Sequence, residues 1–366
     1  MMNIKELEEK IKDCNKRYYD GEEPISDLEY DKLIAELRAL DPHNTLLDTV
    51  IDEVNDIEGF EKRKLPITMG TLKKCQNEKQ IFEEFRKRGN SNYILEHKID
   101  GNGQLLCCGD GNLEDVISRG NAEDGFVMTD NFKKIPYRNK TDTIVLPNGE
   151  NFEGHIRGEV YMSNEVFEKK YSKLMKNPRA AAAGIMKRLD GNGCEDLSFI
   201  AYDVFNDYFA DKAEKEKLLF LRDNGFAIPA FKEVSSPEEM IEWRKEVAAL
   251  RDKLPYPIDG IVAKSQEVDY EDLMRVTPMK NFAIKFDLDY AISKIIDIEW
   301  SFKGSMLSPV AIIEPVELCG TTVSRASLHN VNIMEELGVE IGKLAMITKR
   351  GEIIPKVEKC LEQKDL

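Results

Sequence analysis

The sequence predicts a multidomain α+β protein. Apolar residues recur at helical spacing in residues 1–58, strand-like and helical segments alternate in residues 59–292, and short apolar runs typical of strands fill residues 293–366. A chain of 366 residues is long enough for two or three domains, each with its own core. We therefore expect a small helical domain, a mixed domain with mainly antiparallel sheets and a C-terminal β-domain.

The composition argues against several classes of protein. With 42% hydrophobic and 33% charged residues, the chain is typical of a water-soluble protein, and no apolar run approaches the roughly 20 residues of a membrane-spanning helix. The first residues lead into an acidic helical pattern rather than a signal peptide. The seven cysteines include no C-x-x-C pair and the four histidines stand singly, so we expect no zinc site. We expect a cytosolic protein without disulfides.

The charge is unevenly distributed. The net charge of −16 argues against indiscriminate binding to nucleic acid. Residues 1–58 carry 17 acidic and 7 basic side chains, or −10, whereas residues 295–366 carry 11 and 8, or −3. Most of the acidity therefore lies in the N-terminal segment, and the rest of the chain can still form a basic groove.

The N-terminal segment is expected to form two helices. Apolar residues recur at helical spacing in residues 3–18 and again in residues 27–40. Asp27 suits the N-cap of the second helix, and Asp41-Pro42 ends that helix. An acidic linker at about 45–60 then leads to the mixed domain.

The middle of the chain alternates between two kinds of element. Short apolar runs indicate strands, and longer amphipathic runs indicate helices. The strand candidates are Tyr93–Lys98, Gln104–Cys108, Phe199–Phe205 and Ile261–Lys264, and the helix candidates are Phe167–Met175 and Pro237–Leu250. The first two strands flank Gly101-Asn102-Gly103, which predicts that a tight turn joins them as in a β-hairpin.

The last part of the chain is predicted to be a small barrel. Five short strand candidates follow one another, with a short helix at Val331–Leu337 among them. The strand candidates are Ile295–Trp300, Ser308–Ile313, Thr321–Ser324, Leu344–Lys349 and Ile353–Glu358. Five short strands and one helix suit an OB-type barrel.

The segment Glu96-His97-Lys98-Ile99-Asp100-Gly101 is the first candidate site. Its two carboxylates and its lysine are spaced two apart, so on a strand they point to one face, and the glycine allows a tight turn after them. Such a lysine can attack a phosphate once its amine is neutral. An ordinary lysine has a pKa of about 10.4, so neighbouring cations or desolvation must lower that value. The alternative is a surface hairpin with solvated charges.

Two further lysines stand at the ends of apolar runs. Lys264 ends Asp259-Gly260-Ile261-Val262-Ala263-Lys264, and Lys285 follows Phe282-Ala283-Ile284. A lysine in a buried strand needs a partner, so two such lysines on adjacent strands could face one phosphate. The alternative is that both are ordinary lysines that extend to solvent.

Two more motifs are weaker signals. Glu159, in the strand-like Ile156-Arg157-Gly158-Glu159-Val160, could bind a ribose hydroxyl or a metal ion, and the alternative is a cross-strand ion pair. Arg179 opens the alanine-rich run that ends at Gly184 and could bind phosphate. The alternative for this run is a plain alanine helix.

The order of these motifs resembles the NAD-dependent DNA ligases. The matching segments are Lys98-Ile99-Asp100-Gly101, Ser118-Arg119-Gly120, Arg157-Gly158-Glu159, Asn177-Pro178-Arg179, Tyr202-Asp203-Val204-Phe205, Asp259-Gly260 with Lys264, and Lys285. Before them, Tyr18-Tyr19 and Asp27-Leu28-Glu29-Tyr30-Asp31 resemble the family's helical domain for nicotinamide mononucleotide (NMN). After them, Leu307–Ala311, Glu314–Val316, Val323–Asn330 and Gly351–Pro355 resemble its OB domain.

The resemblance implies a division into three domains. Residues 1–58 correspond to a helical NMN-binding domain, and residues 293–366 correspond to an OB-fold domain. Residues 59–292 correspond to a nucleotidyltransferase, or adenylation, core that is ATP-grasp-like and built of antiparallel sheets.

The resemblance also implies a reaction. Lys98 attacks the α-phosphate of NAD, forms lysyl-AMP and releases NMN; the AMP passes to the 5′-phosphate of a nick in duplex DNA, and the 3′-hydroxyl displaces it, as replication and repair require. Each step is an in-line displacement at phosphorus, so catalysis depends on positioning and charge neutralisation. The catalytic residues implied are Lys98, Asp100, Arg119, Asp259, Lys264 and Lys285.

The binding roles follow the same resemblance. Glu96 contacts adenine, Tyr202 packs against the base and Glu159 contacts the ribose. The residues implied to bind the phosphates are Arg119, Lys264 and Lys285. Arg251 stands where the family has an arginine and is a further candidate for binding NAD. The residues implied to bind NMN are Tyr18, Tyr19, Asp27, Tyr30 and Asp31. Mg²⁺ or Mn²⁺ is expected, with Glu159 and Asp259 as candidate ligands, and DNA is expected at Arg179, Lys187, Lys303 and Arg325.

The sequence departs from the family pattern at several positions. Lys187 and Lys303 stand for arginines, which keeps the charge but loses the two-pronged guanidinium. Asn121 stands for an aspartate, Ala180 for an asparagine, and Met279-Lys280 for an Arg-Trp pair. We expect weaker phosphate contacts at the two lysines.

The family's zinc finger, helix-hairpin-helix and BRCT domains have no counterpart in the sequence. Those parts grip DNA, so we expect this chain to encircle a nick poorly by itself. Three interpretations stay open: a compact enzyme such as a viral one, a second chain that supplies the missing parts, and a truncated sequence. The expected location is the bacterial nucleoid or, for a virus, the host cytosol.

Two other functions remain as alternatives. An ATP- or GTP-using nucleotidyltransferase, such as an RNA ligase or capping enzyme, shares Lys-x-Asp-Gly and an OB domain but not the NMN-binding helices. A scaffold that binds DNA or NAD without sealing has no chemical need for Lys98, Glu159 and Lys285 together.

Overall fold

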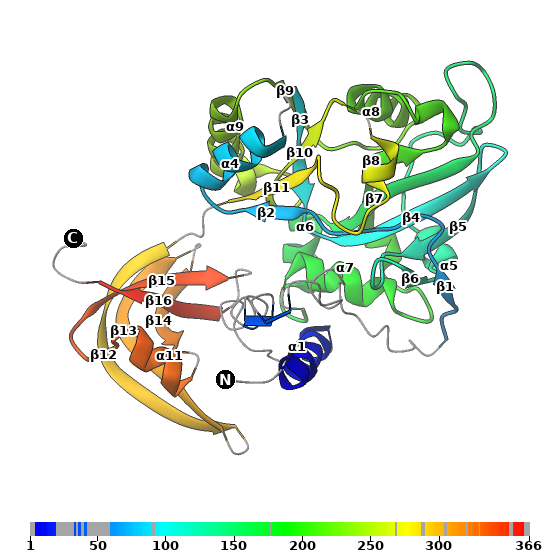
Figure 1. Cartoon of the computed structure of the whole chain (residues 1–366). Coiled ribbons are helices and arrows are strands. Elements are labelled where there is room, and N and C mark those ends of the chain that lie inside the picture. Colours follow the sequence, from blue (N-terminus) through cyan, green and yellow to red (C-terminus); the bar gives the residue numbers. More distant parts are fainter. Residues whose placement is uncertain are drawn as a thin grey trace. The chain divides into compact units, whose positions relative to one another are not determined.

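A computed structural model of the chain describes residues 4–19, 33, 36, 37, 40, 41, 59–88, 92–175, 177–267, 269–286, 290–303, 306–318, 321–328, 330–350 and 354–361. By its packing the chain forms two compact units, residues 1–20 with 34–286 and residues 21–33 with 287–366. The first holds a five-stranded and a four-stranded sheet, and the second a closed barrel (Figure 1). Across the described ranges, every helix is too short or too polar to traverse a lipid bilayer.

The first predicted helix is confirmed. Helix α1 runs from Ile4 to Tyr19, and it buries Leu7, Ile11 and Cys14, the residues at helical spacing. The predicted helix at 27–40 lies largely outside the described residues, as does the predicted linker at 45–60. The NMN-binding candidates Asp27, Tyr30 and Asp31, and the side chains of Tyr18 and Tyr19, also lie outside them.

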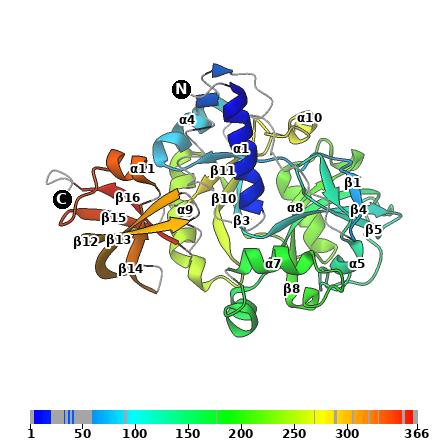
Figure 2. The same cartoon turned by 90° about the horizontal axis from the view of Figure 1, so that it is seen from below.

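The five-stranded sheet carries helices on one face. Its strand order is β2 (Lys73–Cys75), β11 (Phe282–Lys285), β10 (Ile258–Ser265), β3 (Tyr93–Ile99) and β9 (Phe231–Val234). Only the pairing of β11 with β2 is parallel among these. Helices α4 (Glu78–Arg88) and α9 (Pro237–Leu250) pack apolar side chains against it (Figure 2). Alternation therefore places the even-numbered residues of β3 on the face opposite the helices.

The four-stranded sheet has the order β5 (Asn112–Ser118), β4 (Asn102–Gly109), β7 (Gly154–Met162) and β8 (Leu197–Phe205), all antiparallel. A large apolar core joins it to α5 (Thr129–Phe132), α7 (Pro178–Met186) and α8 (Glu214–Asp223). The predicted helix at Phe167–Met175 is instead a short helix α6 (Asn164–Val166) that continues as a π-turn at Phe167–Tyr171.

Short elements complete this unit. Strand β1 (Lys62–Lys64) pairs antiparallel with β6 (Asp124–Phe126). The remaining short helices are η2 (Cys194–Asp196), η3 (Asp207–Phe209), η4 (Arg251–Lys253) and α10 (Tyr270–Leu273). They connect the longer elements around the two sheets.

The predicted hairpin at Gly101 is wrong. Strand β3 pairs with β10 and β9, whereas β4 pairs with β5 and β7, so the chain passes from one sheet to the other at this glycine. A Cβ on Gly101 would lie 2.2 Å from the Val160 carbonyl oxygen, so only glycine fits this crossing. A local turn signal predicts a reversal of the chain but not which strands will pair.

The five-stranded barrel in the second unit is confirmed. Its strands are β12 (Tyr290–Lys303), β13 (Met306–Leu318), β14 (Thr321–Ser327), β16 (Ile354–Cys360) and β15 (Leu344–Arg350), in that order around the barrel. Helix α11 (Val331–Glu336) begins at Asn330, whose side chain accepts a hydrogen bond from the Ile333 amide. The parallel contact of β14 with β16 closes the barrel, and an apolar core fills it.

Candidate active site

Three neighbouring strands bring two lysines and an aspartate together. Gly260 of β10 lies opposite Lys98 of β3 on one side and Lys285 of β11 on the other. The register shifts between Ile258 and Gly260, so Asp259 is the extra residue of a β-bulge. A Cβ on Gly260 would lie 2.3 Å from the Ile284 carbonyl oxygen, so this row of residues requires glycine at its centre.

Asp259 is shared by the two lysines. The Lys98 Nζ lies 3.1 Å from Oδ1 and 3.3 Å from Oδ2, and the Lys285 Nζ donates a hydrogen bond to Oδ2. Burial raises the pKa of the Asp259 carboxyl, but the two ammonium groups outweigh it and hold the value below the usual range. Burial and the charge of Lys98 lower the pKa of Lys285. The arrangement suits a phosphate, because two cations point to one place.

A second group of charges surrounds Lys264. Its Nζ lies 3.0 Å from Glu96 Oε1 and 3.6 Å from Glu214 Oε2, and it donates a 2.5 Å hydrogen bond to the Tyr202 carbonyl oxygen. Burial alone would lower the pKa of Lys264, but the surrounding carboxylates raise it above the usual value. Burial raises the pKa of Glu96 to about 7. Lys264 and Lys285 thus lie on adjacent strands, as predicted, but contact different carboxylates.

Tyr202 also occupies a β-bulge. Gly158 of β7 lies opposite Ala201, and Arg157 lies opposite Asp203, so Tyr202 is the extra residue on β8. Burial and the charge of Glu159 raise the pKa of its hydroxyl. The bulge turns the Tyr202 backbone towards β10, where its carbonyl accepts the Lys264 ammonium.

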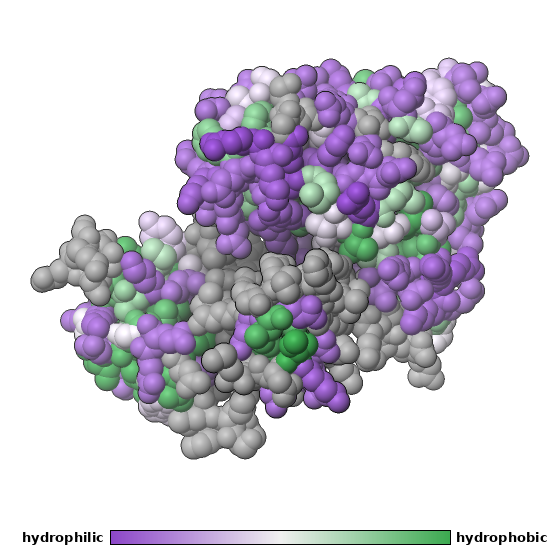
Figure 3. All heavy atoms as spheres, in the orientation of Figure 1, coloured by the Kyte–Doolittle hydropathy of each residue, from purple (hydrophilic) through white to green (hydrophobic). Residues whose placement is uncertain are grey.

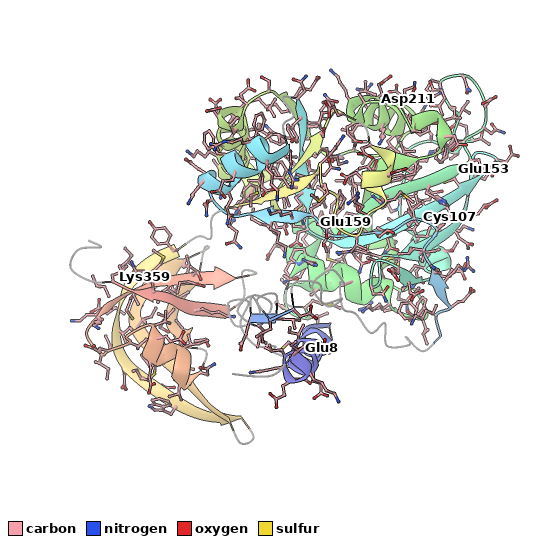
Figure 4. The ribbon with its side chains drawn as sticks, viewed as in Figure 1. Glu8, Cys107, Glu153, Glu159, Asp211 and Lys359 are labelled. Atoms are coloured by element: carbon pink, nitrogen blue, oxygen red, sulfur yellow. The ribbon has the colours of Figure 1, made fainter. Side chains whose placement is uncertain are left out.

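Glu159 lies on β7, and Figure 4 labels it beside the strands of the first unit. Burial raises the pKa of its carboxyl to about 7, and the charge of Asp100 adds to this effect. The opposing positive charges come from Lys98, Arg179 and Arg119. The structure therefore brings Glu159 within electrostatic range of the first lysine group.

Two arginines hold neighbouring backbone and carboxylate groups. Arg179 Nη1 lies 3.0 Å from Asp100 Oδ1, just after β3. Arg119 Nε donates a 3.0 Å hydrogen bond to the Met69 carbonyl oxygen. The segment around Met69 was not found from the sequence, although Gly70 beside it marks a close backbone approach, since a Cβ there would lie 1.8 Å from the Val276 carbonyl oxygen.

The DNA-binding candidates lie on three elements, α7, β12 and β14. Arg179 is in the first turn of α7, after the Asn177 cap that accepts the Ala180 amide at 2.7 Å, and Lys187 lies exposed at the other end of that helix. Arg325 is on β14, 2.5 Å from Glu299 Oε2. Lys303 is on β12, and its side chain lies outside the described residues. Arg251, which is a candidate for binding NAD and not DNA, lies 3.5 Å from Asp252.

The metal candidates differ in their surroundings. Mg²⁺ usually takes one or two carboxylates together with water and substrate phosphates, and no cluster of three or more potential ligands occurs among the described residues. Both carboxylates are partly exposed, but Asp259 lies against two lysine ammonium groups, with Lys98 at 3.1 Å. Glu159 therefore fits a single-carboxylate contact better than Asp259 does.

Four buried charges form a network that the sequence did not reveal: Arg157, Asp203, Glu214 and Lys217. A signal did exist for two of them. Positions 214, 217, 218 and 221 have the i, i+3, i+4, i+7 spacing of a buried helix face, and the first two are Glu and Lys. A charge at such a position predicts a buried ion pair.

Comparisons with known proteins agree over nearly the whole chain. The family model for the NAD-dependent DNA ligase adenylation domain matches residues 60–288, and the NAD-dependent DNA ligase OB-fold domain matches residues 292–365. Residues 1–50 match the DNA ligase-like, N-terminal NAD⁺-binding domain.

Curated relatives agree with these matches. DNA ligases of Treponema denticola, Treponema pallidum and Petrotoga mobilis are 39%, 34% and 35% identical over 98%, 97% and 97% of this chain. The chain spans 57%, 44% and 57% of their respective lengths, so about half of each relative is matched. A solved Lig E DNA ligase gives a TM-score of 0.45 at 16% identity, over 81% of this chain and 100% of that one, which is a weaker likeness.

Proposed function

The chain belongs to the family of NAD-dependent DNA ligases, and from this premise we propose that it seals nicks between a 5′-phosphate and a 3′-hydroxyl in duplex DNA through a lysyl-AMP intermediate. The observation that carries the proposal is the Lys98 amine 3.1 Å from Asp259, with Lys285 on the same carboxylate. A lysine nucleophile, a counter-ion and a second cation are the groups that attack at a phosphate requires.

The first step transfers AMP from NAD to the protein. The neutral Lys98 amine attacks the α-phosphorus, a P–N bond forms, the bond to the NMN phosphate oxygen breaks, and NMN leaves with the electron pair. The Lys285 ammonium lies on the same Asp259 carboxylate as Lys98. In the bound state it neutralises the phosphate oxygens, and Asp259 keeps both side chains aligned.

The Lys264 group is proposed to bind the base. Glu96 offers an acceptor for the exocyclic amino group of adenine, Lys264 offers a donor for the adjacent ring nitrogen, and Tyr202 packs against the ring. Glu159 then binds the ribose. Lys264 lies beside Glu96 at 3.0 Å rather than beside Asp259, which supports a role at the base end in addition to the predicted role at the phosphate.

The later steps use DNA. The adenylate passes from Lys98 to the 5′-phosphate of the nick, and the 3′-hydroxyl then displaces AMP. Arg119 is assigned to the phosphates, and Asp100 to the alignment of Arg179, with which it pairs. The side chains proposed to contact DNA are Arg179, Lys187, Lys303 and Arg325. A second chain is proposed to supply further DNA contacts, and the proposed place of action is the cytosol or nucleoid.

Mg²⁺ or Mn²⁺ is proposed as the metal cofactor. A bound divalent cation neutralises charge on phosphate oxygens. Glu159 is the carboxylate that would hold it directly or through water, because Asp259 is occupied by the two lysines.

Intact-mass measurement tests the proposal. The purified chain is incubated with NAD or with ATP, and its mass is compared before and after. We expect a gain of one AMP with NAD, and no gain in Lys98→Ala or Lys98→Arg, because neither side chain supplies a neutral amine. A gain with ATP alone would favour the RNA ligase or capping alternative, and no gain with either would favour a scaffold.

A further inference from the structure

A line of buried charges runs from the base end of the site to α8. Lys264 contacts Glu96 and Glu214. The network continues from Glu214 to Lys217, from Lys217 to Asp203 and from Asp203 to Arg157. It links strands β3, β10, β8 and β7 to the first two turns of α8, and the proposed mechanism uses only its first two members.

Glu214 is the residue that connects the two halves of this network. Its Oε1 accepts a 2.8 Å hydrogen bond from Lys217, while its Oε2 lies 3.6 Å from Lys264. Its side chain is 3% exposed and that of Lys217 is 1% exposed. Glu214 lies in the first turn of α8, where the helix dipole favours a negative charge. Both carboxylate oxygens are thus assigned to lysines on different elements.

The network is balanced in charge. Three carboxylates face three cations, and every one of the six residues is less than one-tenth exposed. Removing one partner of a buried pair leaves an uncompensated charge. Lys217 therefore makes it possible for a second carboxylate, Glu214, to lie beside Lys264, while Asp203 and Arg157 complete the balance on β8 and β7.

Glu214 acts on Glu96 in two ways. It draws on the same ammonium that Glu96 contacts, and its negative charge raises the pKa of Glu96. The other charges that face Glu96 are Lys264 from β10, which lowers that pKa, and Asp203 from β8, which raises it. The position of the Lys264 ammonium and the ionisation of Glu96 both depend on α8.

We propose that Glu214 and Lys217 are positioning residues for Glu96 and Lys264, and that through this pair α8 determines which base the nucleotide site accepts. The inference rests on the proposed function, in which that pair contacts the base. Adenine presents an amino donor beside a ring acceptor, whereas its deaminated form, hypoxanthine, presents a carbonyl acceptor beside an N–H donor. A carboxylate and an ammonium held side by side therefore select adenine, and a displaced ammonium weakens that selection.

Binding of AMP and of IMP, measured by calorimetry on the full chain, tests the inference without requiring catalysis. We expect wild type to prefer AMP, and Glu214→Gln to lose about tenfold in AMP affinity, the effect of one charged hydrogen-bond partner, with little change for IMP. Glu216→Gln is the matched control, because Glu216 lies in the same turn of α8 but is exposed. It should bind both nucleotides as wild type does.

A second variant covers the case in which Glu214→Gln does not fold. Glu214→Gln with Lys217→Met removes one carboxylate and one ammonium, so the buried charge stays balanced, and it should show the same loss of AMP preference. In a variant that also forms the adduct, the KM for NAD should rise while kcat changes little, because base binding is altered and the phosphates are not.

The outcomes separate the two proposals. Wild-type base preference in the folded variants, single or double, would overturn the role of α8. A preference of wild type for AMP that is lost in these variants would support the role of α8. If wild type formed no lysyl-AMP, that result would overturn the proposed function but not the role of α8. A wild type that binds AMP and IMP equally would overturn the inference outright.

Discussion

Two glutamates of the site have unusual acidity. Burial raises the pKa of both Glu96 and Glu159 to about 7, well above the value for a glutamate in water. The charge of Lys264 opposes the shift at Glu96, and the charge of Lys98 opposes it at Glu159, but burial dominates in both. Both carboxyls therefore gain a proton as the pH falls below about 7.

The rate of lysyl-AMP formation should follow this titration. Glu96 pairs with Lys264 and Glu159 is proposed to bind the ribose, each as a carboxylate. These carboxylates are lost below about pH 7, so the rate should fall as the solution becomes more acidic. Titration of the two carboxyls should add up to about two to the slope of the logarithm of the rate against pH on the acid side. In Glu96→Gln that slope should be smaller by about one, because one of the two carboxyls no longer titrates.

Single-turnover mass measurements from about pH 5 to 9 give these slopes. Glu153→Gln is a suitable control, because Glu153 is an exposed residue just before β7 (Figure 4). An acid limb of the same steepness in wild type and Glu96→Gln would contradict the assignment of Glu96 to this titration.

At the scale of elements, two β-bulges position the site. One inserts Asp259 into β10 between two lysine-bearing strands, and the other inserts Tyr202 into β8. A regular strand alternates its side chains between two faces, so an extra residue changes which side chains share a face. Gly260, beside the first bulge, and Gly101, where the chain passes between the two sheets, allow neighbouring backbone to approach closely.

Gly260→Ala should destabilise the first unit by about 2 kcal/mol or more, because its Cβ would meet backbone that cannot move aside easily. Gly184→Ala is the opposite case: the helical position in α7 has its nearest neighbours at 3.9 Å and 4.0 Å. Alanine at position 184 should raise the free energy of unfolding by about 0.5–1 kcal/mol, because alanine has a higher helix propensity than glycine.

Urea denaturation followed by circular dichroism compares the two variants with wild type, and adduct formation is measured alongside. Gly260→Ala should also slow adduct formation, since Lys98 and Lys285 flank that position. A Gly260→Ala protein as stable as wild type would show that the β10–β11 contact can expand, contrary to the argument.

At the scale of the whole molecule, the surface and the interior of the protein carry different groups. The surface of the described parts is largely hydrophilic in the view of Figure 3, while the reacting groups lie between two sheets whose outer faces are covered by helices. The net charge is −16, so the DNA binding that we propose would depend on local clusters of basic side chains.

The N-terminal segment should matter for one step only. By the family resemblance it binds the NMN half of NAD, so Tyr19→Ala or Asp31→Ala should block formation of lysyl-AMP from NAD. Both variants should still seal a nick that already carries AMP on its 5′-phosphate, because no NMN is present in that reaction.

A gel assay with pre-adenylated nicked DNA measures the second activity, and intact mass measures the first. Lys98→Ala is the informative comparison, because it should lose adduct formation at any NAD concentration. Equal loss of both activities in Tyr19→Ala and Asp31→Ala would contradict the assignment of this segment to NMN.

Local pattern determined much of the protein. Neighbouring residues predict the bounds of α9 at Pro237–Leu250 and the five barrel strands. They mark Lys98, Glu159 and Lys285 only as candidates, and the family resemblance assigns their roles. The period at which apolar residues recur indicates which face of a helix or strand is buried, and burial of that face stabilises the element.

Tertiary structure decided the rest. It separated β3 from β4 into two sheets, inserted Asp259 and Tyr202 through bulges, and placed Lys264 between Glu96 and Glu214. These features depend on strand pairing, on register and on ion pairs between distant residues, such as Lys264 with Glu96, 168 positions apart, and Lys264 with Glu214, 50 positions apart. Local preferences contain no information about such partners, because the free energy that selects them is released only when distant segments pack.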